Sequence, residues 1–347
     1  MTGRGRALAQ VDLGAIERNC ARLPKPLCAV VKADGYGHGA VAPAALAGGA
    51  TWLAVATATE ARDLRDQGVD APVLVMGALT REELRTAVEA GADVVAWTDE
   101  VAESAPRVHV QLDTGMGRLG TKDREHALRL AAGPNVVGLM THFATADEPG
   151  DELFPAQLEA FQAFVEQVGR DDLVVHAANS AAALREPASH FDMVRCGIAI
   201  YGMDPFHEDP AAHGLEPALS LHSWVAALRR FVPGDSAGYG RRWTAETSRW
   251  VATVPIGYGD GWRRGLSGNC DVLIGGRRHP LVGTVSMDNV TVDLGADTDV
   301  RVGDPVVLIG RQGDERILAE EVARRLGTIN YEVTTGLSPR VRREHVR

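Results

Sequence analysis

The chain has very little lysine. Of its 36 lysine and arginine residues, only Lys25, Lys32 and Lys122 are lysines. This shortage matters because arginine cannot form the Schiff base by which a lysine amine holds a carbonyl compound. Lys25 lies between two prolines and Lys122 lies in a polar Thr-Lys-Asp-Arg run, so we expect both in solvent. If a lysine does covalent work in this chain, it is therefore Lys32.

Other features that the chain lacks exclude whole classes of protein. Its net charge is −10 and its basic residues form no stripe, which argues against nonspecific nucleic-acid binding. Its four cysteines have neither metal-ligand spacing nor a disulfide-rich pattern, so we expect no metal site. No apolar run approaches the length of a membrane span, and the first residues lead to no apolar signal region. We therefore expect a cytoplasmic protein without a membrane or nucleic-acid partner.

The stretch around Lys32 combines a buried strand with a sharp turn. Residues 28–32 form a short apolar run that ends in the lysine, and Gly35, Gly37 and Gly39 follow at once. A buried parallel strand has such a run, and glycines directly after it indicate a close approach of the backbone. Burying an unpaired ammonium is costly, so the position suits a lysine that is neutralised or bonded. The alternative is that Lys32 extends from the strand end into water.

Apolar runs alternate with helical patterns up to residue 216. The predicted strands are 27–32, 52–57, 72–76, 93–97, 107–112, 136–141, 173–177 and 193–200. The helical patterns between them include 40–47, 59–67, 81–90 and 151–168. Such alternation predicts a parallel sheet, and eight units predict a closed (β/α)8 barrel of the TIM type. An open doubly wound sheet is the alternative, but it usually has fewer strands, and the chain has no strand–GxGxxG–helix fingerprint for it.

After residue 216 the alternation stops and strand patterns predominate. The predicted strands, separated by turn residues, are 219–228, 250–256, 270–274, 282–294 and 305–309. One helix is predicted over 318–326, and an extended segment over 328–341. This pattern of strands and turns predicts a second, mostly β domain.

The start of the chain adds one strand and sets the domain bounds. Residues 7–11 are a possible strand, and Asp12 is the expected N-cap of a helix through Arg22. We expect a barrel domain over 8–216 and a β-rich domain over 217–347, to which residues 1–11 can contribute a strand.

In a barrel the catalytic groups lie at the carboxyl ends of the strands. Several predicted strands end in polar stretches: Lys32, 113–118, 141–143, 176–180 and 195–198. Glycines and small polar groups after the last two strands suit a phosphate site, because backbone N–H groups there can point at an anion. Taken singly, His142 could be a hydrogen-bonded core histidine, and Arg118 could pair with Asp113. Their common position at one rim favours a functional set.

The tyrosines point to the same chemistry. Three of the five, Tyr36, Tyr239 and Tyr258, lie in Gly-Tyr-Gly triplets, and Tyr201 precedes a glycine. A tyrosine between glycines has little packing around its backbone, which suits a phenol presented to a cavity to bind phosphate or transfer a proton. The alternative is an exposed ring at a turn, which we expect for Tyr201.

The most specific motifs are long. Those of the predicted barrel are Ala29-Val-Val-Lys-Ala-Asp-Gly-Tyr-Gly-His-Gly39, Asp113-Thr-Gly-Met-Gly-Arg-Leu-Gly120, Thr141-His-Phe-Ala-Thr-Ala-Asp147, Ala178-Asn-Ser180 and Val194-Arg-Cys-Gly-Ile198. Those of the second domain are Gly238-Tyr-Gly240, Pro255-Ile-Gly-Tyr-Gly-Asp-Gly261, Ser286-Met-Asp288 and Ile329-Asn-Tyr-Glu332. In these motifs the chain closely resembles the alanine racemases, almost from end to end. These are pyridoxal-phosphate enzymes of fold type III, built from an eight-stranded barrel and a β domain.

The resemblance implies a role for each matching residue. Lys32 would hold the cofactor covalently, with His142 against its pyridine ring and Arg195 at its pyridine nitrogen. The residues that would bind the cofactor around its phosphate are Tyr36, Asn179, Ser180, Gly197, Ile198 and Tyr331. Arg118 and Met287 would hold the substrate carboxylate, and Tyr258 would stand at the entrance. Tyr239 would be the second base. Tyr239 and Met287 would come from the partner subunit, so the resemblance also implies a homodimer with shared sites.

The expected reaction accounts for these residue types. Racemisation removes a proton from one face of Cα and returns one to the other, so two bases are expected, here Lys32 and Tyr239. Phenols lose their proton reluctantly, so a nearby cation such as Arg118 should favour the phenolate. Arg195 stays protonated and cannot pass a proton to the ring nitrogen, which should suppress side reactions such as transamination.

Three positions depart from the family pattern. Gln111 stands where many members carry a carbamylated lysine that orients the carboxylate-binding arginine. Glutamine can bond to Arg118 but brings no negative charge. Thr284 replaces a frequent entrance arginine, and Ser286 replaces a common cysteine before the methionine. These changes leave room for a modified substrate range.

We therefore expect interconversion of L- and D-alanine, supplying D-alanine for peptidoglycan. One alternative is a racemase of another small amino acid such as serine. A second is a non-catalytic pyridoxal-phosphate carrier, although a second domain with Tyr239 and Met287 speaks against it. A related decarboxylase lacks support because no Gly-Gly-Gly phosphate loop and no Cys-Asp pair are present.

Overall fold

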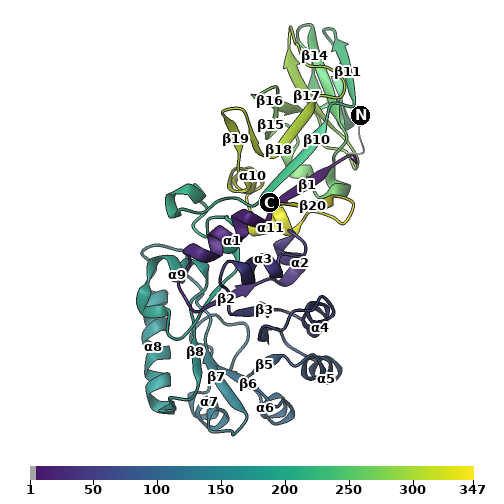
Figure 1. Ribbon diagram of the computed structural model, residues 1–347. Helices are drawn as coiled ribbons and strands as arrows, with labels where there is room; N and C mark the ends of the chain where they lie inside the picture. Colours follow the sequence, from purple (N-terminus) through teal and green to yellow (C-terminus); the bar gives the residue numbers. More distant parts are fainter. Residues whose placement is uncertain (1–4) are drawn as a thin grey trace. The chain divides into compact units, whose positions relative to one another are not determined.

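The computed structural model describes residues 5–347 (Figure 1). The chain forms two compact units. One comprises Ile16–Tyr36 and Ala40–Glu216, and the other comprises the residues up to Ala15, Gly37–Gly39 and Pro217–Arg347. Residues 1–4, part of the segment expected to add a strand, lie outside the described chain.

The first unit contains eight parallel strands, as the alternation predicts. They pair in the order β8-β7-β6-β5-β4-β3-β2-β9. Their bounds are β2 (Leu27–Val30), β3 (Trp52–Val55), β4 (Val73–Val75), β5 (Asp93–Ala96), β6 (Val108–Gln111), β7 (Val136–Met140), β8 (Val174–His176) and β9 (Val194–Cys196). Nearly every residue of these strands is buried, which explains the continuous apolar runs in the sequence.

The two ends of this sheet meet, so the barrel is nearly closed. No ladder joins β8 to β9 within the described residues, but two backbone hydrogen bonds join β8 and the residues after it to β9 and the residues before it. Asp192 donates to the Val175 carbonyl at 3.0 Å, and Arg195 donates to the Ala178 carbonyl at 2.8 Å. The (β/α)8 prediction is therefore confirmed, and the carboxyl ends of all eight strands share one rim.

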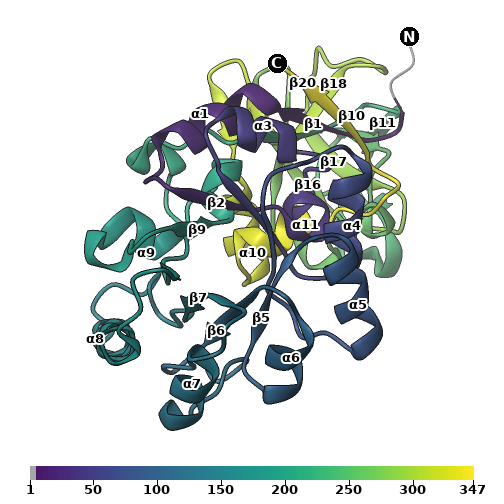
Figure 2. The ribbon, with the colours of Figure 1, turned by 60° about the horizontal axis from the view of Figure 1, so that its bottom comes forward.

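Helices follow the strands and lie outside them (Figure 2). They are α1 (Leu13–Arg22), α3 (Ala42–Ala47), α4 (Ala58–Asp66), α5 (Arg81–Glu89), α6 (Asp99–Ser104), α7 (Arg124–Ala131), α8 (Leu153–Val168) and α9 (Ser180–Arg185). Side chains cap several of them. The Asp12 carboxylate accepts from the Ala15 N–H at 2.9 Å, as its N-cap prediction requires. Thr57 with Glu60 and Thr80 with Glu83 form capping boxes at α4 and α5.

The second unit is built on a mostly antiparallel sheet that also takes in the first strand of the chain, with β1 and β20 paired in parallel. The order is β11-β14-β17-β16-β15-β18-β10-β1-β20, with β19 on β18. The bounds are β1 (Leu8–Asp12), β10 (Leu219–Trp224), β11 (Ala227–Phe231), β14 (Arg249–Val254), β15 (Asp271–Ile274), β16 (Arg277–Val282), β17 (Val290–Gly295), β18 (Pro305–Gln312), β19 (Glu315–Ile317) and β20 (Arg342–Val346). A separate hairpin is formed by β12 (Ser236–Ala237) and β13 (Trp243–Thr244). The helices of this unit are α10 (Ala319–Leu326) and α11 (Asn330–Thr335).

Three predictions for this unit are wrong. The run 219–228 is two strands, because the chain turns at 225–226 and Val225 donates to the Asp304 carbonyl at 2.9 Å. The run 282–294 is interrupted by a loop over 283–289, which starts at Gly283 with a φ of +71° against the Ala237 carbonyl. The segment 328–341 is not extended, since it contains α11, whose buried Asn330 donates to Glu320 of α10 at 3.0 Å. Each departure depends on a contact distant in sequence.

Among residues 5–347, no helix has the length and apolar character needed to cross a membrane.

Candidate active site

Lys32 follows β2 at the carboxyl rim of the barrel and begins an unusual turn, α2 (Lys32–Tyr36). Residues 33–36 are all left-handed, with φ between 53° and 58°. Only Gly35 among them is a glycine, and a left-handed residue with a side chain costs about 1–2 kcal/mol. The turn thus stores strain directly after the lysine, which is common at functional sites.

The Lys32 amine lies in a positive and half-buried environment. Burial is the main cause that lowers its pKa below the ordinary value, and the charge of Arg118 lowers it further. Glu60 acts in the opposite direction. A lowered pKa favours the neutral amine, the form that can act as a nucleophile or a base.

Tyr36, Ser180 and Gly197 converge near the ends of β8 and β9. The Ser180 hydroxyl accepts from the Gly197 N–H at 3.1 Å and from the Ala199 N–H at 3.3 Å. A Cβ on Gly197 would overlap with the phenol oxygen of Tyr36, so only glycine allows the phenol to come this close. Hydroxyls and backbone N–H groups gathered at one point are the donor set that phosphate requires.

Tyr201 differs from the expectation of an exposed ring. It is completely buried, its ring stacks on Tyr36 with centroids 5.0 Å apart, and its hydroxyl donates to the Val30 carbonyl at 3.0 Å. A buried phenol needs a hydrogen-bond partner, and Val30 supplies it. Tyr201 therefore packs its ring against Tyr36 in the interior instead of facing solvent.

Asn179 and Ile198 flank this group. The Asn179 side chain accepts from the Ala182 N–H at 3.0 Å and so caps α9, the helix that begins with Ser180. Ile198 is completely buried. The geometry gives Asn179 a structural role in placing Ser180, next to any role toward a cofactor.

Arg195 lies buried in β9 and makes a dense set of hydrogen bonds. Its guanidinium donates to the Thr141 carbonyl at 2.8 Å, the Ala177 carbonyl at 3.0 Å and His142 Nδ1 at 3.3 Å. Burial lowers the pKa of Arg195 to about 10. Burial, with the positive charge of Arg195 next in size, lowers the pKa of His142 to about 3. His142 is therefore a neutral ring at neutral pH, suited to contact with another ring.

A chain of hydrogen bonds runs from Arg195 back through the barrel. Arg195 Nη1 donates to His176 Nδ1 at 2.8 Å, so the proton of His176 is on Nε2. His176 Nε2 then donates to His109 Nδ1 at 2.7 Å, and His109 Nε2 donates to Asp93 at 3.2 Å. Arg107 pairs with the same carboxylate at 2.7 Å. The geometry thus fixes one neutral tautomer for each histidine.

The electrostatics agree with these tautomers. Burial is the first cause that lowers the pKa values of His109 and His176. Burial alone would raise the pKa of Asp93, but hydrogen bonds from His109 and Arg107 hold it below the usual value. Asp93 therefore remains ionised and anchors the chain of neutral rings behind Arg195.

Arg118 lies in the exposed loop after β6. The Asp113 carboxylate accepts from the N–H groups of Gly115 and Gly117 at 3.0 and 3.1 Å, so it shapes the loop, and no ion pair to Arg118 is found within residues 5–347. Gln111 donates to the Leu119 carbonyl at 3.0 Å. The bond that Gln111 was expected to offer to Arg118 thus goes to the neighbouring backbone. The guanidinium of Arg118 is left available for an anionic ligand.

Tyr239 belongs to the second unit and is 73% exposed. It begins the short helix η4 (Tyr239–Arg241), between Gly238 and Gly240, which both have positive φ. The Thr284 hydroxyl donates to the Tyr239 carbonyl at 2.8 Å. Thr284 therefore fixes the backbone of Tyr239 and leaves the phenol outside, and both residues line an open pocket with Ser286.

Tyr258 and Met287 lie on two loops that are bonded to each other. The Tyr258 N–H donates to the Ser286 carbonyl at 3.0 Å, and the Gly259 N–H donates to the Met287 carbonyl at 2.9 Å. Both side chains are exposed, at 41% and 52%. The pairing holds the backbones of the two loops together.

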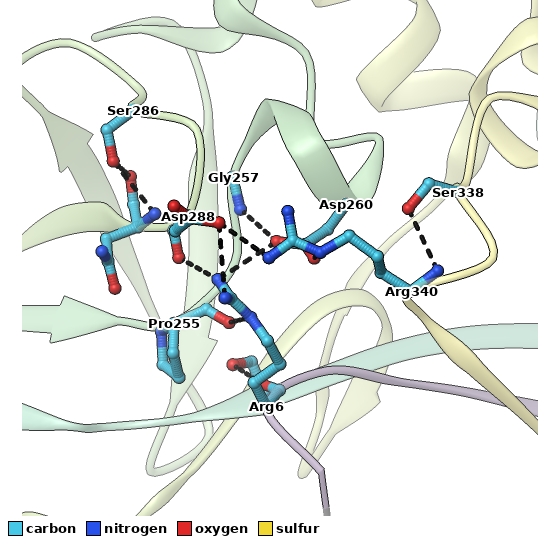
Figure 3. Close-up of polar contacts among 10 residues, drawn as sticks. Arg6, Pro255, Gly257, Asp260, Ser286, Asp288, Ser338 and Arg340 are labelled. Atoms are coloured by element: carbon cyan, nitrogen blue, oxygen red, sulfur yellow. Dashed lines mark hydrogen bonds and ion pairs between the residues drawn. The ribbon is translucent and has the colours of Figure 1, made fainter.

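Four charges lock these two loops together (Figure 3). Arg340 contacts Asp288 at 2.7 Å and Asp260 at 3.4 Å, and Arg6 contacts the same two carboxylates at 3.4 and 3.3 Å. Asp260 is completely buried and also accepts from the Gly257 N–H at 2.9 Å. The hydrogen bond from Arg340 is the main cause that lowers the pKa of Asp288.

The structure brings together the predicted residues of the barrel. Arg118 lies close enough to lower the pKa of Lys32, and the charges of Arg195, Arg118 and Lys32 all lower the pKa of His142. Tyr239, Tyr258 and Met287 lie in the second unit, as does the half-buried Tyr331, which is in the first turn of α11. Three residues at this rim or behind it were missed: Glu60, Asp93 and His109. Asp93 and His109 could have been found, because each is a polar residue inside an apolar run that predicts a buried strand.

Comparison with known proteins identifies the family. The profile of the alanine racemase N-terminal domain matches residues 11–205, and that of the alanine racemase C-terminal domain matches residues 218–345. An alanine racemase from Geobacillus kaustophilus is 42% identical over 359 residues, covering 96% of this chain and 93% of the relative. Alanine racemase 1 from Bacillus subtilis is 42% identical, covering 96% and 92%.

Solved structures give the same result. The crystal structure of alanine racemase from Bacillus anthracis with bound L-Ala-P has a TM-score of 0.91 at 39% identity, covering 100% of this chain and 96% of that chain. Alanine racemase from a D-cycloserine producing Streptomyces lavendulae has a TM-score of 0.92 at 36% identity, covering 99% and 98%. This chain belongs to the alanine racemase family.

Proposed function

We propose that the protein interconverts L- and D-alanine with pyridoxal 5'-phosphate as cofactor. The observation that carries the proposal is the Lys32 amine, whose pKa is lowered at the barrel rim beside Arg118 and His142. Such an amine suits covalent attachment and proton transfer. The relatives with this fold and more than 40% identity are named alanine racemases, which supports the same reaction here.

The rim residues fit pyridoxal phosphate. The close approach of Tyr36 to Gly197, with Ser180 beside them, forms a cradle of phosphate donors that a Cβ would fill. Ile198, Asn179 and, from the second unit, Tyr331 would complete it. When bound, the cofactor supplies an aldehyde that takes up amines and a ring that accepts electron density from Cα.

The protein's own residues would then move the protons. The Lys32 amine would serve one face of Cα and the Tyr239 phenol the other, each removing or returning a proton. The exposed guanidinium of Arg118 would hold the substrate carboxylate together with Met287, and Tyr258 would stand at the entrance. Gln111 holds the backbone next to Arg118 through its bond to the Leu119 carbonyl.

Tyr239 and Met287 would come from a second copy of the chain, so we propose a homodimer with shared sites. We propose that the barrel binds the cofactor, and that 217–347 together with β1 supplies the opposite wall. The buried free thiols of all four cysteines agree with a reducing cytoplasm, where D-alanine for peptidoglycan is needed.

A substrate panel tests this function directly. We expect the highest kcat/KM for alanine when L- and D-forms of alanine, serine and other small amino acids are followed by chiral chromatography. A higher value for serine would favour the alternative racemase. Bound cofactor with no turnover of any amino acid would favour a carrier.

Gly197→Ala should weaken cofactor binding. The added methyl group would displace the Tyr36 phenol, and overpacking of this kind costs about 1–3 kcal/mol, or roughly 5- to 150-fold in Kd. Titration of the cofactor-free protein with pyridoxal phosphate, followed by absorbance, measures the change. The melting temperature of the cofactor-free variant serves as the control for folding. An unchanged Kd would mean that this cradle does not hold the phosphate.

Arg195→Glu should raise the ratio of transamination to racemisation. Arg195 holds its proton and has none to give to the ring nitrogen, whereas a carboxyl group can share one. Pyruvate formed from alanine, measured against D-alanine formed in the same reaction, gives the ratio. Circular dichroism is needed beside it because the variant removes the donors to Thr141 and Ala177. If the ratio stays constant in a folded variant, Arg195 does not control the reaction path.

A further inference from the structure

The left-handed turn after Lys32 is held by a carboxylate from another segment. Glu60 Oε1 accepts the N–H of Ala33 at 2.6 Å. Ala33 is the first of the four left-handed residues and directly follows the lysine. This bond therefore acts at the point where strain would otherwise be released by rotation of the backbone next to Lys32.

Glu60 is itself fixed by its own helix terminus. Its Oε2 atom accepts from the N–H groups of Ala56 and Thr57 at 2.9 and 3.0 Å, and its N–H donates to the Thr57 hydroxyl at 3.2 Å. These bonds form the capping box of α4, which follows β3. Because β3 pairs with β2 in parallel, both connections leave the sheet at the same rim. One carboxylate thus links α4 rigidly to the turn that carries Lys32.

The other contacts of the turn secure its far end. Gly35 donates to the Val31 carbonyl at 3.1 Å, and the Tyr36 ring stacks on Tyr201. Among the side-chain contacts of the turn, it is Glu60 that accepts from the N–H of the Lys32–Ala33 peptide. The conformation of that peptide sets the direction in which the lysine side chain leaves the backbone.

The capping box of α5 provides a comparison, because within residues 5–347 its glutamate makes only the capping bonds, whereas Glu60 also binds the Lys32 turn. At α5, Glu83 accepts with Oε2 alone from the Thr80 N–H at 2.8 Å and the Thr80 hydroxyl at 2.9 Å. The Glu83 N–H donates to the Thr80 hydroxyl at 3.3 Å. One carboxylate oxygen is therefore enough to cap a helix of this barrel, and the second oxygen of Glu60 serves the Lys32 turn.

We propose that Glu60 is a positioning residue for Lys32, holding the left-handed turn 33–36 so that the amine points to the reaction centre. The inference rests on the proposed function of Lys32 as the cofactor-binding base. Glu60 touches neither cofactor nor substrate in this role. Its negative charge also opposes the effect of Arg118 on the lysine, as the pKa of Lys32 reflects.

Glu60→Gln tests the proposal, with Glu83→Gln as the matched control. Glutamine has one accepting oxygen and a nitrogen that only donates, so it cannot accept from both Ala33 and the α4 terminus. Both variants remove the charge of a capping carboxylate and keep one accepting oxygen for the cap, but only Glu60→Gln disturbs the Lys32 turn. A difference between them therefore separates positioning of the lysine from loss of a helix cap.

The shortage of lysine makes a direct measurement possible. With ¹³C-labelled lysine, the full-length chain gives signals from only three lysines, and Lys32→Arg assigns the one of interest. In the cofactor-free protein we expect Glu60→Gln to move the Lys32 Cε signal and to lower its titration midpoint. Glu83→Gln should leave both unchanged. Pyridoxal phosphate should bind roughly 10- to 100-fold more weakly to Glu60→Gln, as expected for losing a charge-assisted bond.

A double variant keeps the test decisive if Glu60→Gln folds poorly. Glycine at position 33 adopts positive φ without strain, so Ala33→Gly in the Glu60→Gln background should recover part of the binding. An unmoved Lys32 signal in Glu60→Gln, or an equal shift in Glu83→Gln, would overturn the proposal. Failure of the proposed function would look different, because the wild-type protein would then bind no pyridoxal phosphate at Lys32 whatever the variants do.

Discussion

Lys32→Ala should remove racemase activity, by at least about 10⁴-fold in kcat/KM. The variant would lose both the amine that we propose attaches the cofactor and one of the two proposed bases. Neither Lys25 nor Lys122 can substitute, since the Lys25 amine donates to the Cys20 carbonyl and Lys122 lies in an exposed turn. Chiral chromatography of alanine measures the turnover, and the visible absorbance of the protein reports attachment of the cofactor.

Lys122→Ala is the control for this variant, and it should retain full activity and absorbance. Borohydride reduction of the wild-type protein, followed by peptide mass spectrometry, should place the modification on Lys32 alone. Turnover by Lys32→Ala within tenfold of wild type, or modification of another lysine, would contradict the assignment.

Tyr239→Phe should reduce racemisation by about 10²–10⁴-fold in both directions. The phenylalanine keeps the ring but removes the hydroxyl that we propose serves the second face of Cα. Because Tyr239 is 73% exposed and its backbone is fixed by Thr284, the fold should not change. Steady-state rates with L-alanine and D-alanine measure the effect, and melting curves confirm folding.

Tyr258→Phe is a useful comparison because Tyr258 also lies in a Gly-Tyr-Gly triplet and is exposed. If Tyr258 stands at the entrance, as we propose, Tyr258→Phe should change KM more than kcat. If the two variants behaved alike, the special role of Tyr239 would have no support.

Much of the barrel could be predicted from the sequence. Strands buried on both faces give continuous apolar runs, so all eight were found, and each observed strand lies within its predicted range. The rim residues could also be found, because polar groups after such runs have few other places to lie. Lys32 was recognisable for this reason, and Arg195 as a charged residue inside such a run.

What could not be predicted depends on contacts between distant segments. Tyr201 looked like a turn residue because nothing local reveals its stacking on Tyr36. The helix α11 depends on Asn330 bonding to Glu320, which no periodicity shows. Glu60 resembles an ordinary capping residue until its second oxygen is seen at Ala33. The second domain was harder throughout, since loops such as 283–289 interrupt runs that read as single strands.

The most direct test of the two-base account is exchange of the α-proton in deuterated water. In the wild-type protein, both enantiomers of alanine should gain deuterium as they racemise. In Tyr239→Phe, one enantiomer should still exchange its α-proton through Lys32 and keep its configuration, while the other should exchange far more slowly. Rapid exchange of both enantiomers in Tyr239→Phe, with racemisation preserved, would show that a single base serves both faces and would contradict the account.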